Sequence, residues 1–398
     1  LNFPYIIEKN TTFQHYVEQP LISTFTDRIT TPTGHNIIVA LDCRAGNNAE
    51  DSIQCSSSAA DRGYWAVSQF NFEKSELERS EIFGMPDATI TANIKREANY
   101  AGVDGITARV GSVVRQNDVL IVKVVKMPKA DNNGNRYKDA STLNRRIEPA
   151  RVVNVVRAHN GQAEFIRVKI ESYRPIGDGD KLSSRTGNKG IVSITTPACD
   201  MPYTEDGLGI DLLVNAHSMP TRMALNQMIE AMLGIYAARL GCNIDATAFR
   251  SIDVRGVVDQ LATMGVKYAG HRRVYSGITG EPIDTLLFIG PTNYQRLEKF
   301  VIDEQYAIRS GPTSALTRQP QQGKAHAGGL RIGEMEKDTL CAQGSMQALY
   351  EKLWRDSDGT YNVICTTCGN PAIFNEQKSI YWCKGCDNKA VFARINTT

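Results

Sequence analysis

The chain has 398 residues, a length that predicts two or three domains. Apolar residues make up 41% of it and charged residues 22%, which excludes an intrinsically disordered chain, and it has no run of about 18 apolar residues that would predict a membrane span. The formal net charge of +2 excludes a uniformly basic protein, so any surface for a polyanion must be local. Residues 145–190 have such an excess, with ten Lys or Arg against five Asp or Glu, although solvated strand faces would give the same pattern.

The first two hundred residues are predicted to be mostly β-structure. The β-branched run at 36–43 predicts a buried strand, and the Val/Ile runs within 104–127 predict further short strands. Alternating residues at 150–173 flank Asn160-Gly161, a pair that favours the positive φ of a tight turn. We therefore expect a β-hairpin there.

Helices are predicted only in the second half of the chain. Residues 217–241 have a wide apolar stripe, with Ser218 as the expected N-cap and Gly241 as the end of the helix. Residues 292–308 and 334–356 have amphipathic patterns that predict two more helices. The chain is therefore expected to belong to the α+β class.

Four of the nine cysteines have the spacing of a metal site. Cys365 and Cys368 form one CxxC pair, Cys383 and Cys386 form another, and fourteen residues separate the pairs. Four thiolates complete a tetrahedral shell, which predicts structural zinc and leaves no open position for a catalytic water. A redox pair or an iron–sulfur centre is the alternative. The other five cysteines are scattered and odd in number, which favours a reducing compartment over a disulfide framework.

A glycine-rich basic loop is expected at 177–190, where the sequence is GDGDKLSSRTGNKG. Glycines let the backbone approach a ligand closely, and Lys181 and Lys189 on either side of Arg185 would neutralise a phosphate backbone or a triphosphate. The motif of a Walker A loop is absent from the chain. A surface hairpin with solvated lysines is the alternative.

Three further stretches carry candidate phosphate-site residues. Glu50 and Asp51 are adjacent on a polar loop after a predicted strand, where they would contact magnesium or simply form a solvated turn. Arg222 is expected in the first turn of a helix, a position that favours a nearby anion. The segment 316–338 is long, rich in glycine and basic before it becomes acidic, and loops of this length are usually functional or mobile.

Together these stretches resemble one family, the second-largest or β-type subunit of multi-subunit DNA-dependent RNA polymerases. The resemblance covers nearly the whole chain, and the C-terminal cysteine pairs resemble the eukaryotic, archaeal and large-virus branch. The strings that carry it, in chain order, are AEDSIQCSSSAADRG (49–63), GDKLSSRTGNKG (179–190), DMPYTEDG (200–207), NAHSMPTRM (215–223), GPTNYQRL (290–297), GPTSALTRQPQQGKAHAGGLRIGEMEKD (311–338) and CKGCDNK (383–389). Since only the C-terminal part of the family pattern is present and the first residue is Leu, we expect a split or processed subunit, or a fragment.

The resemblance implies roles for individual residues. Lys181 and Lys189 would lie near the RNA 3′ end and the incoming nucleotide, and Arg222 would contact its triphosphate. Glu50 and Asp51 would lie beside the second magnesium ion. The implied contacts to the RNA–DNA hybrid and its surroundings are made by Arg185, Arg318, Gln319, Lys324 and Arg331.

The resemblance also implies a domain organisation. We expect residues 1–66 and 175–330 to form a double-psi β-barrel with a hybrid-binding region, and residues 67–174 to form a β-rich flap or wall insert. Residues 331–356 would form an anchor-like helical segment, and residues 357–398 a zinc ribbon with the clamp.

The resemblance also implies partner molecules, because the family's catalytic aspartate motif is absent from this chain. The largest, β′-type subunit would hold the catalytic magnesium with an aspartate triad, and no NADFDGD-like string occurs in this chain. The other implied partners are the N-terminal half of the β-type subunit, template DNA, RNA and nucleoside triphosphates, with no membrane. The chain would be active only in the complex, in a nucleus, a cytoplasm or a virion. A non-catalytic zinc-ribbon protein that binds nucleic acid or an assembly partner is the alternative.

Overall fold

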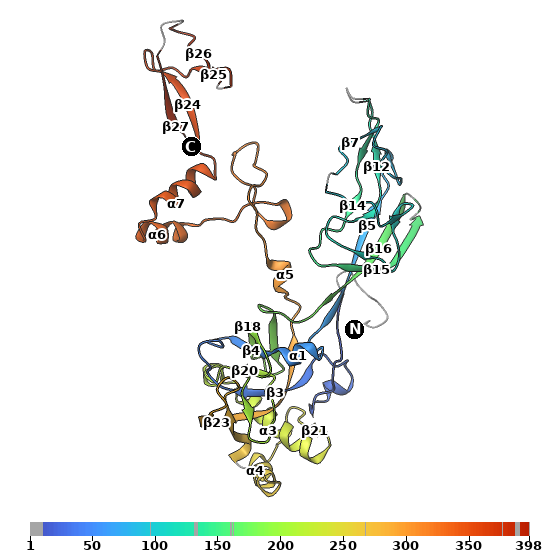
Figure 1. Cartoon of the computed structure of the whole chain (residues 1–398), viewed down its shortest axis with the longest axis vertical. Helices are drawn as coiled ribbons and strands as arrows, with labels where there is room; N and C mark the ends of the chain where they lie inside the picture. Colours follow the sequence, from blue (N-terminus) through green and yellow to red (C-terminus); the bar gives the residue numbers. More distant parts are fainter. Residues whose placement is uncertain are drawn as a thin grey trace. The chain divides into compact units, whose positions relative to one another are not determined.

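The structure of the chain is a computed structural model (Figure 1). It describes residues 11–95, 97–130, 134–159, 161, 163–266, 268–375, 377–386 and 391–397. The chain consists of two compact units, Leu1–Asp303 and Glu304–Thr398. Among the described residues, no helix combines the length and the apolar character that a membrane crossing requires. The mixture of sheets and helices confirms the predicted α+β class.

Six strands of the first unit close into a β-barrel. They are β3 (His35–Leu41), β4 (Ser52–Ser56), β17 (Lys181–Ser184), β18 (Lys189–Thr196), β20 (Leu212–Val214) and β23 (Pro282–Arg296). Hydrogen-bonded neighbours follow the order β17-β18-β4-β20-β3-β23, and β23 pairs again with β17, so the ring is closed. Two pairs, β18 with β4 and β20 with β3, run parallel, whereas the others are antiparallel. The strand predicted at 36–43 is confirmed as β3.

All six barrel strands contribute to one apolar core. Its buried side chains include Ile37, Ile53, Leu182, Val192, Leu212 and Tyr294. Trp65 joins this cluster and is fully buried, and its indole Nε1 donates a hydrogen bond to the backbone oxygen of Tyr294. Because side chains alternate across a strand, burial of Leu182 directs its neighbours Lys181 and Ser183 to the outer face of the barrel wall.

Helix α3 (Leu225–Leu240) packs against β23 at very close range. A Cβ atom at Gly290 would lie 2.8 Å from the backbone oxygen of Ala231, and one at Gly234 would lie 2.6 Å from that of Pro291. Glycine on both elements is therefore required for this contact. Helix α4 (Val254–Thr263) buries Leu261 beside Met232 of α3.

The single helix expected at 217–241 is divided in two. A short α2 (Ser218–Thr221) is followed by a break in which Met223 has a φ of 53°, and α3 then ends before Gly241, as predicted, with a φ of 69° at that glycine. Ser218 is inside α2 rather than its N-cap, a position that His217 takes. The left-handed conformation at Met223 is the physical cause of the break.

The helix predicted at 292–308 is wrong. Strand β23 continues through Arg296, and only α5 (Val301–Glu304) is helical. Backbone pairing of β23 with β3 and β17, together with complete burial of Tyr294, outweighs the helical pattern of the sequence. The remaining short elements of this part are β2 (Ile22–Ser23), η1 (Thr26–Arg28), α1 (Ser57–Asp61), β19 (Tyr203–Thr204), β21 (Ile244–Asp245), η2 (Tyr268–Gly270) and β22 (His271–Tyr275).

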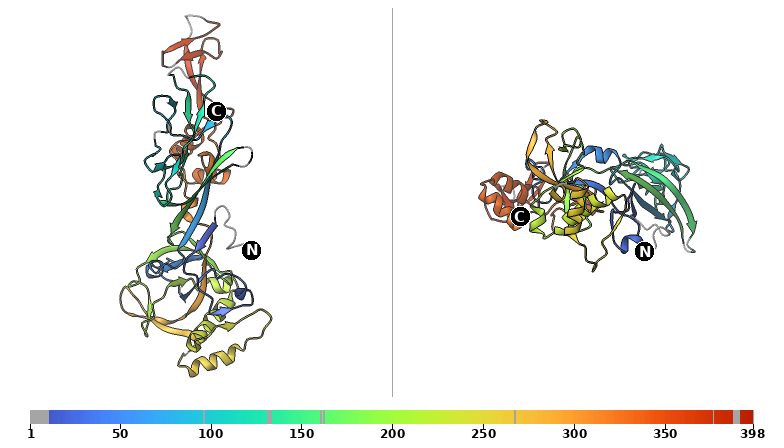
Figure 2. Two further views of the ribbon diagram at one scale, coloured as in Figure 1. Left: turned by 90° about the vertical axis from the view of Figure 1, so that its right-hand side faces the viewer. Right: turned by 90° about the horizontal axis from the view of Figure 1, so that it is seen from below.

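The chain between Trp65 and Ile176, together with β1 near the N-terminus, forms sheets outside the barrel (Figure 1 and Figure 2). The largest has the order β1-β5-β16-β15-β10, with β1 (Thr11–Gln14), β5 (Val67–Glu76), β16 (Glu164–Arg174), β15 (Ala150–His159) and β10 (Val113–Val114). The hairpin predicted at 150–173 is confirmed as β15 and β16. Gly161 has the expected positive φ, at 87°, whereas Asn160 lies outside the described residues.

Two smaller sheets accompany the large one. The first has the order β6-β12-β13-β7 and the second the order β14-β11-β9-β8. Their strands are β6 (Glu81–Ile82), β7 (Thr91–Ala92), β8 (Val103–Asp104), β9 (Thr107–Ala108), β11 (Val119–Ile121), β12 (Val124–Lys126), β13 (Tyr137–Asp139) and β14 (Thr142–Leu143). Short strands were therefore correctly predicted within 104–127.

The second unit starts with an irregular segment, and its described residues include four short helices. Its helices are η3 (Lys324–His326), α6 (Glu334–Ala342), α7 (Met346–Tyr350) and η4 (Glu351–Arg355). The single helix predicted at 334–356 is interrupted at Gly344, where φ is 77°. The segment 304–330, which the sequence analysis grouped with the barrel, belongs to this unit. Within the unit, the hydroxyl of Tyr306 donates a 2.7 Å hydrogen bond to the backbone oxygen of Gly328.

Candidate functional site

The two predicted lysines lie on one face of a β-hairpin. In the antiparallel pairing of β17 and β18, Lys181 is opposite Ile191 and Ser183 is opposite Lys189. Opposite residues share a face, and alternate residues along a strand return to it, so Lys181 and Lys189 are on the same side. The prediction that both lysines lie in a loop is wrong, because the loop is confined to residues 185–188 between two barrel strands.

Parallel pairing of β18 with β4 brings Asp51 next to Lys189. The backbone nitrogen of Ile191 donates a 3.0 Å hydrogen bond to the backbone oxygen of Asp51. A Cβ atom at Gly190 would lie 2.4 Å from the same oxygen, so glycine is required at this crossing. Glu50, the residue before Asp51, is exposed and has a φ of 51°.

Arg222 reaches the same place from the end of α2. Its Nη2 atom is paired with Oδ1 of Asp51, while Nη1 donates to Oδ1 of Asn188 at 2.6 Å and to the backbone oxygen of Lys189 at 3.1 Å. The expectation that Arg222 lies in the first turn of a helix is wrong, because it is the C-cap of α2. A cation is electrostatically favourable at a helix C-terminus, so its position alone does not require an anion.

Positive charge at this barrel edge is available to a ligand. In the described parts of the chain, neither lysine ammonium has a hydrogen-bond or ion-pair partner; Lys189 is exposed and Lys181 is partly buried. A hollow of about 150 Å³ lies beside Arg222 and is lined by polar groups that include Thr186, Asn188 and Asn226. The geometry therefore brings together Lys189, Asp51 and Arg222, with Lys181 on the same face of the hairpin.

The sequence analysis missed Asn188 and considered Ser218 only as a helix N-cap. The Nδ2 atom of Asn188 donates to Oε1 of Gln227 at 3.0 Å and to the hydroxyl of Ser218 at 3.3 Å, which leaves its Oδ1 atom to accept from Arg222. Asn188 is 4% exposed, so it is a buried link between the hairpin and the two helices. In the sequence, the only signal for it was an amide side chain placed between Gly187 and Lys189.

Arg185 is held by groups of the protein itself. Its guanidinium pairs with Asp27 at 3.1 Å and with Glu230 at 3.0 Å, and it donates to the backbone oxygen of Ile22 at 2.6 Å. These contacts give Arg185 a structural role in joining the hairpin turn to α3 and to the segment around η1. Its contact with nucleic acid stays a prediction.

The remaining predicted nucleic-acid residues lie in the second unit. Gln319 and Arg331 line the same groove of about 870 Å³, and the amide of Gln319 donates to Asp358 at 2.9 Å. Arg318 is exposed with a φ of 56°, and Lys324 begins η3. Their roles in nucleic-acid binding stay predictions.

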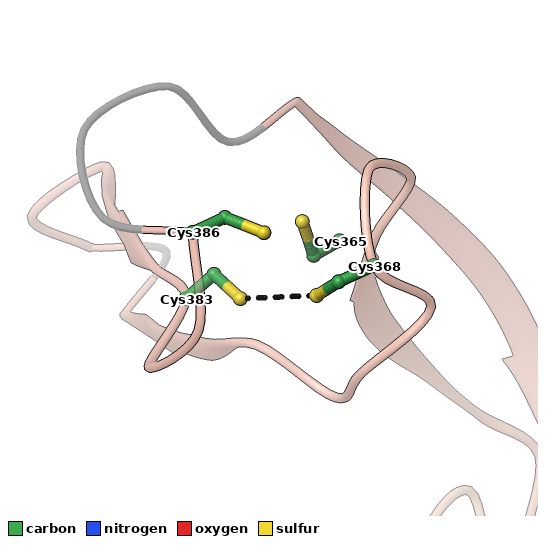
Figure 3. Close-up of side chains that lie close together, drawn as sticks. All are labelled: Cys365, Cys368, Cys383 and Cys386. Atoms are coloured by element: carbon green, nitrogen blue, oxygen red, sulfur yellow. Dashed lines mark hydrogen bonds between the residues drawn. The ribbon is translucent and has the colours of Figure 1, made fainter.

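The four cysteines of the C-terminal motif form one cluster (Figure 3). Cys365 ends β24 (Thr360–Cys365), which pairs with β27 (Phe392–Thr397), and a second hairpin of β25 (Ile373–Asn375) and β26 (Ile380–Trp382) connects the two CxxC turns. All four sulfur atoms lie within 4.8 Å of one another, and those of Cys368 and Cys383 are 3.5 Å apart.

This cluster has the geometry and chemistry of a metal site. Four zinc–sulfur bonds of about 2.3 Å in a tetrahedron place the sulfurs about 3.8 Å apart, which fits the observed cluster. Burial opposes ionisation of Cys365, but hydrogen bonds from the backbone of Cys368 and Thr367 outweigh it and lower the pKa of this thiol to about 6. The predicted four-cysteine metal site is therefore confirmed as a cluster that could hold a metal ion.

Comparison with protein families gives two adjacent matches. Residues 1–326 match the family described as RNA polymerase Rpb2, domain 6, and residues 328–398 match RNA polymerase Rpb2, domain 7. The boundary between the two matches lies within the second compact unit.

Similar proteins come from plants, viruses and fungi. The chain is 35% identical over 395 residues to DNA-directed RNA polymerase II subunit 2 of Arabidopsis thaliana, which covers 96% of this chain and 33% of the relative. It is 36% identical over 375 residues to DNA-directed RNA polymerase subunit 2 of Acanthamoeba polyphaga mimivirus, covering 92% and 31%. It is 33% identical over 399 residues to DNA-directed RNA polymerase II subunit RPB2 of Schizosaccharomyces pombe, covering 96% and 33%. The chain therefore spans about a third of the length of these relatives.

Proposed function

This chain belongs to the RNA polymerase Rpb2 family, and we propose that it forms the active-centre part of the second-largest subunit of a DNA-directed RNA polymerase. One observation carries this proposal: Lys189, Asp51 and Arg222 meet at one edge of the barrel, with Lys181 on the same face of its hairpin. The three segments are far apart in sequence, and each brings a charged side chain. Such an arrangement fits a polyanionic substrate.

Nucleotide addition joins the RNA 3′ oxygen to the α-phosphate of a nucleoside triphosphate and releases pyrophosphate. Catalysis of phosphoryl transfer relies mainly on positioning and on stabilising negative charge. The ammonium groups of Lys181 and Lys189 would neutralise phosphates near the RNA 3′ end and the incoming nucleotide. The planar guanidinium of Arg222 would bind the triphosphate through two parallel hydrogen bonds.

Asp51 holds Arg222 ready for this contact. The carboxylate is 62% exposed and the guanidinium 29% exposed, so a triphosphate has access to the pair. Asp51 and Glu50 offer the hard oxygen atoms that magnesium prefers, and we assign them to the outer contact with the second ion. Magnesium, held mainly by the largest subunit, would supply neutralisation of the developing charge.

The proposal also assigns roles to the other parts of the chain. The four-cysteine cluster would hold a structural zinc ion, since four thiolates leave no position for a substrate. The six-strand ring would be the double-psi β-barrel, residues 67–174 the flap or wall insert, and residues 316–331 a contact to the RNA–DNA hybrid. The partners are the largest subunit, the rest of the β-type subunit, DNA, RNA and nucleoside triphosphates.

The test is nucleotide addition by the assembled complex with Lys189→Ala, Lys181→Ala or Arg222→Ala in this chain. Loss of one preorganised charge contact is expected to slow addition by about 10²-fold or more, and Arg222→Ala should also raise the KM for nucleotide. The matched control is Arg273→Ala, which removes an exposed cation from β22. Normal addition by the three site variants, with nucleic-acid binding retained, would instead support a non-catalytic zinc-ribbon protein.

A further inference from the structure

Arg296, the last residue of β23, joins three separate segments of the first unit. Its Nη1 atom donates to the backbone oxygens of Trp65 at 2.8 Å and Arg174 at 2.9 Å, and its Nη2 atom donates to Oδ2 of Asp180 at 2.7 Å. The side chain is only 3% exposed, and that of Asp180 is 5% exposed. Such a buried, fully charged contact is geometrically demanding and is disrupted by small displacements.

The two backbone oxygens mark the ends of the β-rich insert. Trp65 is two residues before β5, where the chain leaves the barrel, and Arg174 ends β16, where the chain returns. Arg296 therefore holds both crossings of the insert with one guanidinium group. The same group reaches the segment that leads into the lysine hairpin.

Asp180 directly precedes Lys181 and is fixed on two sides. Its Oδ2 atom also accepts a 2.8 Å hydrogen bond from the backbone nitrogen of Gly177. In the pairing of β17 with β23, Leu182 is opposite Arg296, and the backbone nitrogen of Leu297 donates to the backbone oxygen of Lys181 at 2.9 Å. The backbone position of Lys181 is thus set by Asp180 and by β23.

A second arginine extends the contact into the insert. Two guanidinium groups contact the ring of Phe300, whose centroid is 4.7 Å from Cζ of Arg296 and 4.9 Å from Cζ of Arg174. Arg174 pairs with Glu148 of the insert at 2.6 Å and with Asp303 through both terminal nitrogens, at 2.7 Å and 2.8 Å. The two buried cations are balanced by Asp180, Glu148 and Asp303.

We propose that the buried Asp180–Arg296 pair is a positioning device that couples the root of the insert to Lys181. Neither residue touches substrate; they set where the ammonium of Lys181 lies relative to the RNA 3′ end. This inference rests on the proposed function of Lys181. A displacement of about 1 Å at a reacting group is enough to slow catalysis by about 10²-fold. Loss of the Asp180–Arg296 pair is therefore expected to lower the rate of nucleotide addition measurably.

The experiment is a double-mutant cycle on nucleotide addition by the assembled polymerase. Asp180→Asn keeps the shape of the side chain and removes its charge, and we expect the maximal rate to fall about tenfold while the KM for nucleotide stays within about twofold. In a Lys181→Ala background the same substitution should cause no further loss. The matched control is Asp178→Asn, two residues earlier, whose carboxylate accepts from the hydroxyl of Thr195 at 2.8 Å.

Each outcome separates the inference from the proposed function. If Lys181→Ala leaves addition unchanged, the proposed role of the lysine fails, and the inference fails with it. If Lys181→Ala slows addition but Asp180→Asn does not, or if the two effects multiply, only the inference is overturned. Where Asp180→Asn prevents assembly, Phe300→Leu takes its place in the cycle, since it removes the aromatic contact of both arginines without removing a charge. The expected loss is about threefold, and it must again vanish in the Lys181→Ala background.

Discussion

The four-cysteine cluster and the basic edge of the barrel are built in opposite ways. All four sulfur atoms come from the stretch between Cys365 and Cys386, and two CxxC turns bring them together locally. The charged groups at the barrel edge come from β4, from the β17–β18 hairpin and from the end of α2, and long-range strand pairing brings them together. One site is a local motif, whereas the other is a product of the whole fold.

The source of stability differs in the same way. In the described residues of the second unit, the buried apolar side chains and thiols are limited to Val363, Cys365 and Cys383. The barrel instead buries a large apolar cluster to which every one of its six strands contributes. The ribbon is therefore expected to depend on its metal ion, and the basic edge is expected to depend on apolar packing.

Removal of one metal ligand should have the largest effect and should be confined to the ribbon. Cys383→Ser is expected to abolish stoichiometric metal binding and to unfold the hairpins around the cluster, because binding of zinc contributes about 10–16 kcal/mol to the folding of such modules. Metal content and hydrogen exchange of the ribbon amides measure this. Cys341→Ser, an exposed thiol of α6, is the matched control. Loss of protection in the barrel strands as well would contradict the expectation that the ribbon and the barrel have separate sources of stability.

Truncation inside the barrel should have the converse effect. Leu182 is fully buried between the outward-facing Lys181 and Ser183, so Leu182→Ala is expected to lower the free energy of unfolding of the barrel by about 2–5 kcal/mol. Hydrogen exchange of β17 and β18 should increase while metal binding by the four cysteines is retained. Leu240→Ala at the exposed end of α3 is the control. Unchanged exchange in β17 would contradict an apolar origin of the site.

The same distinction explains what could be predicted from the sequence. The four-cysteine cluster and the β15–β16 hairpin follow from local patterns, and both were predicted correctly. The helix predicted at 292–308 was wrong, since long-range pairing with β3 and β17 determines the conformation of residues 292–296. Lys181 and Lys189 were selected from the sequence as candidate site residues. Their positions on β17 and β18, however, depend on long-range contacts that no short stretch encodes.

Partners of individual charges were the least predictable feature. The guanidinium of Arg185 is indistinguishable in sequence from that of Arg222, but the first is enclosed by Asp27 and Glu230 whereas the second lies at an accessible edge with Asp51. The acidic partners come from distant segments in both cases. Composition indicated where positive charge is concentrated, while only the fold distinguishes a structural arginine from an accessible one.

Lowering the pH should have the smallest effect, and it should act on the stability of the barrel through His35. This side chain is fully buried; its Nε2 atom donates to the backbone oxygen of His15 at 2.9 Å, and its Nδ1 atom accepts from Gln14 at 3.2 Å. Burial lowers the pKa of His35 below 6.5, although the His15 carbonyl and nearby Glu18 oppose the shift. Between the two pKa values, His35 is protonated in the unfolded chain but neutral in the folded barrel. The contribution of His35 to the free energy of unfolding is therefore complete above about pH 6.5. It is lost as the pH falls toward the folded pKa, by at most about 1.4 kcal/mol per pH unit. Hydrogen exchange of β3 amides between pH 7 and pH 5, corrected for intrinsic rates, measures the loss, and His35→Gln should remove this dependence. A slope that persists in His35→Gln would assign the acid sensitivity of the barrel to another group.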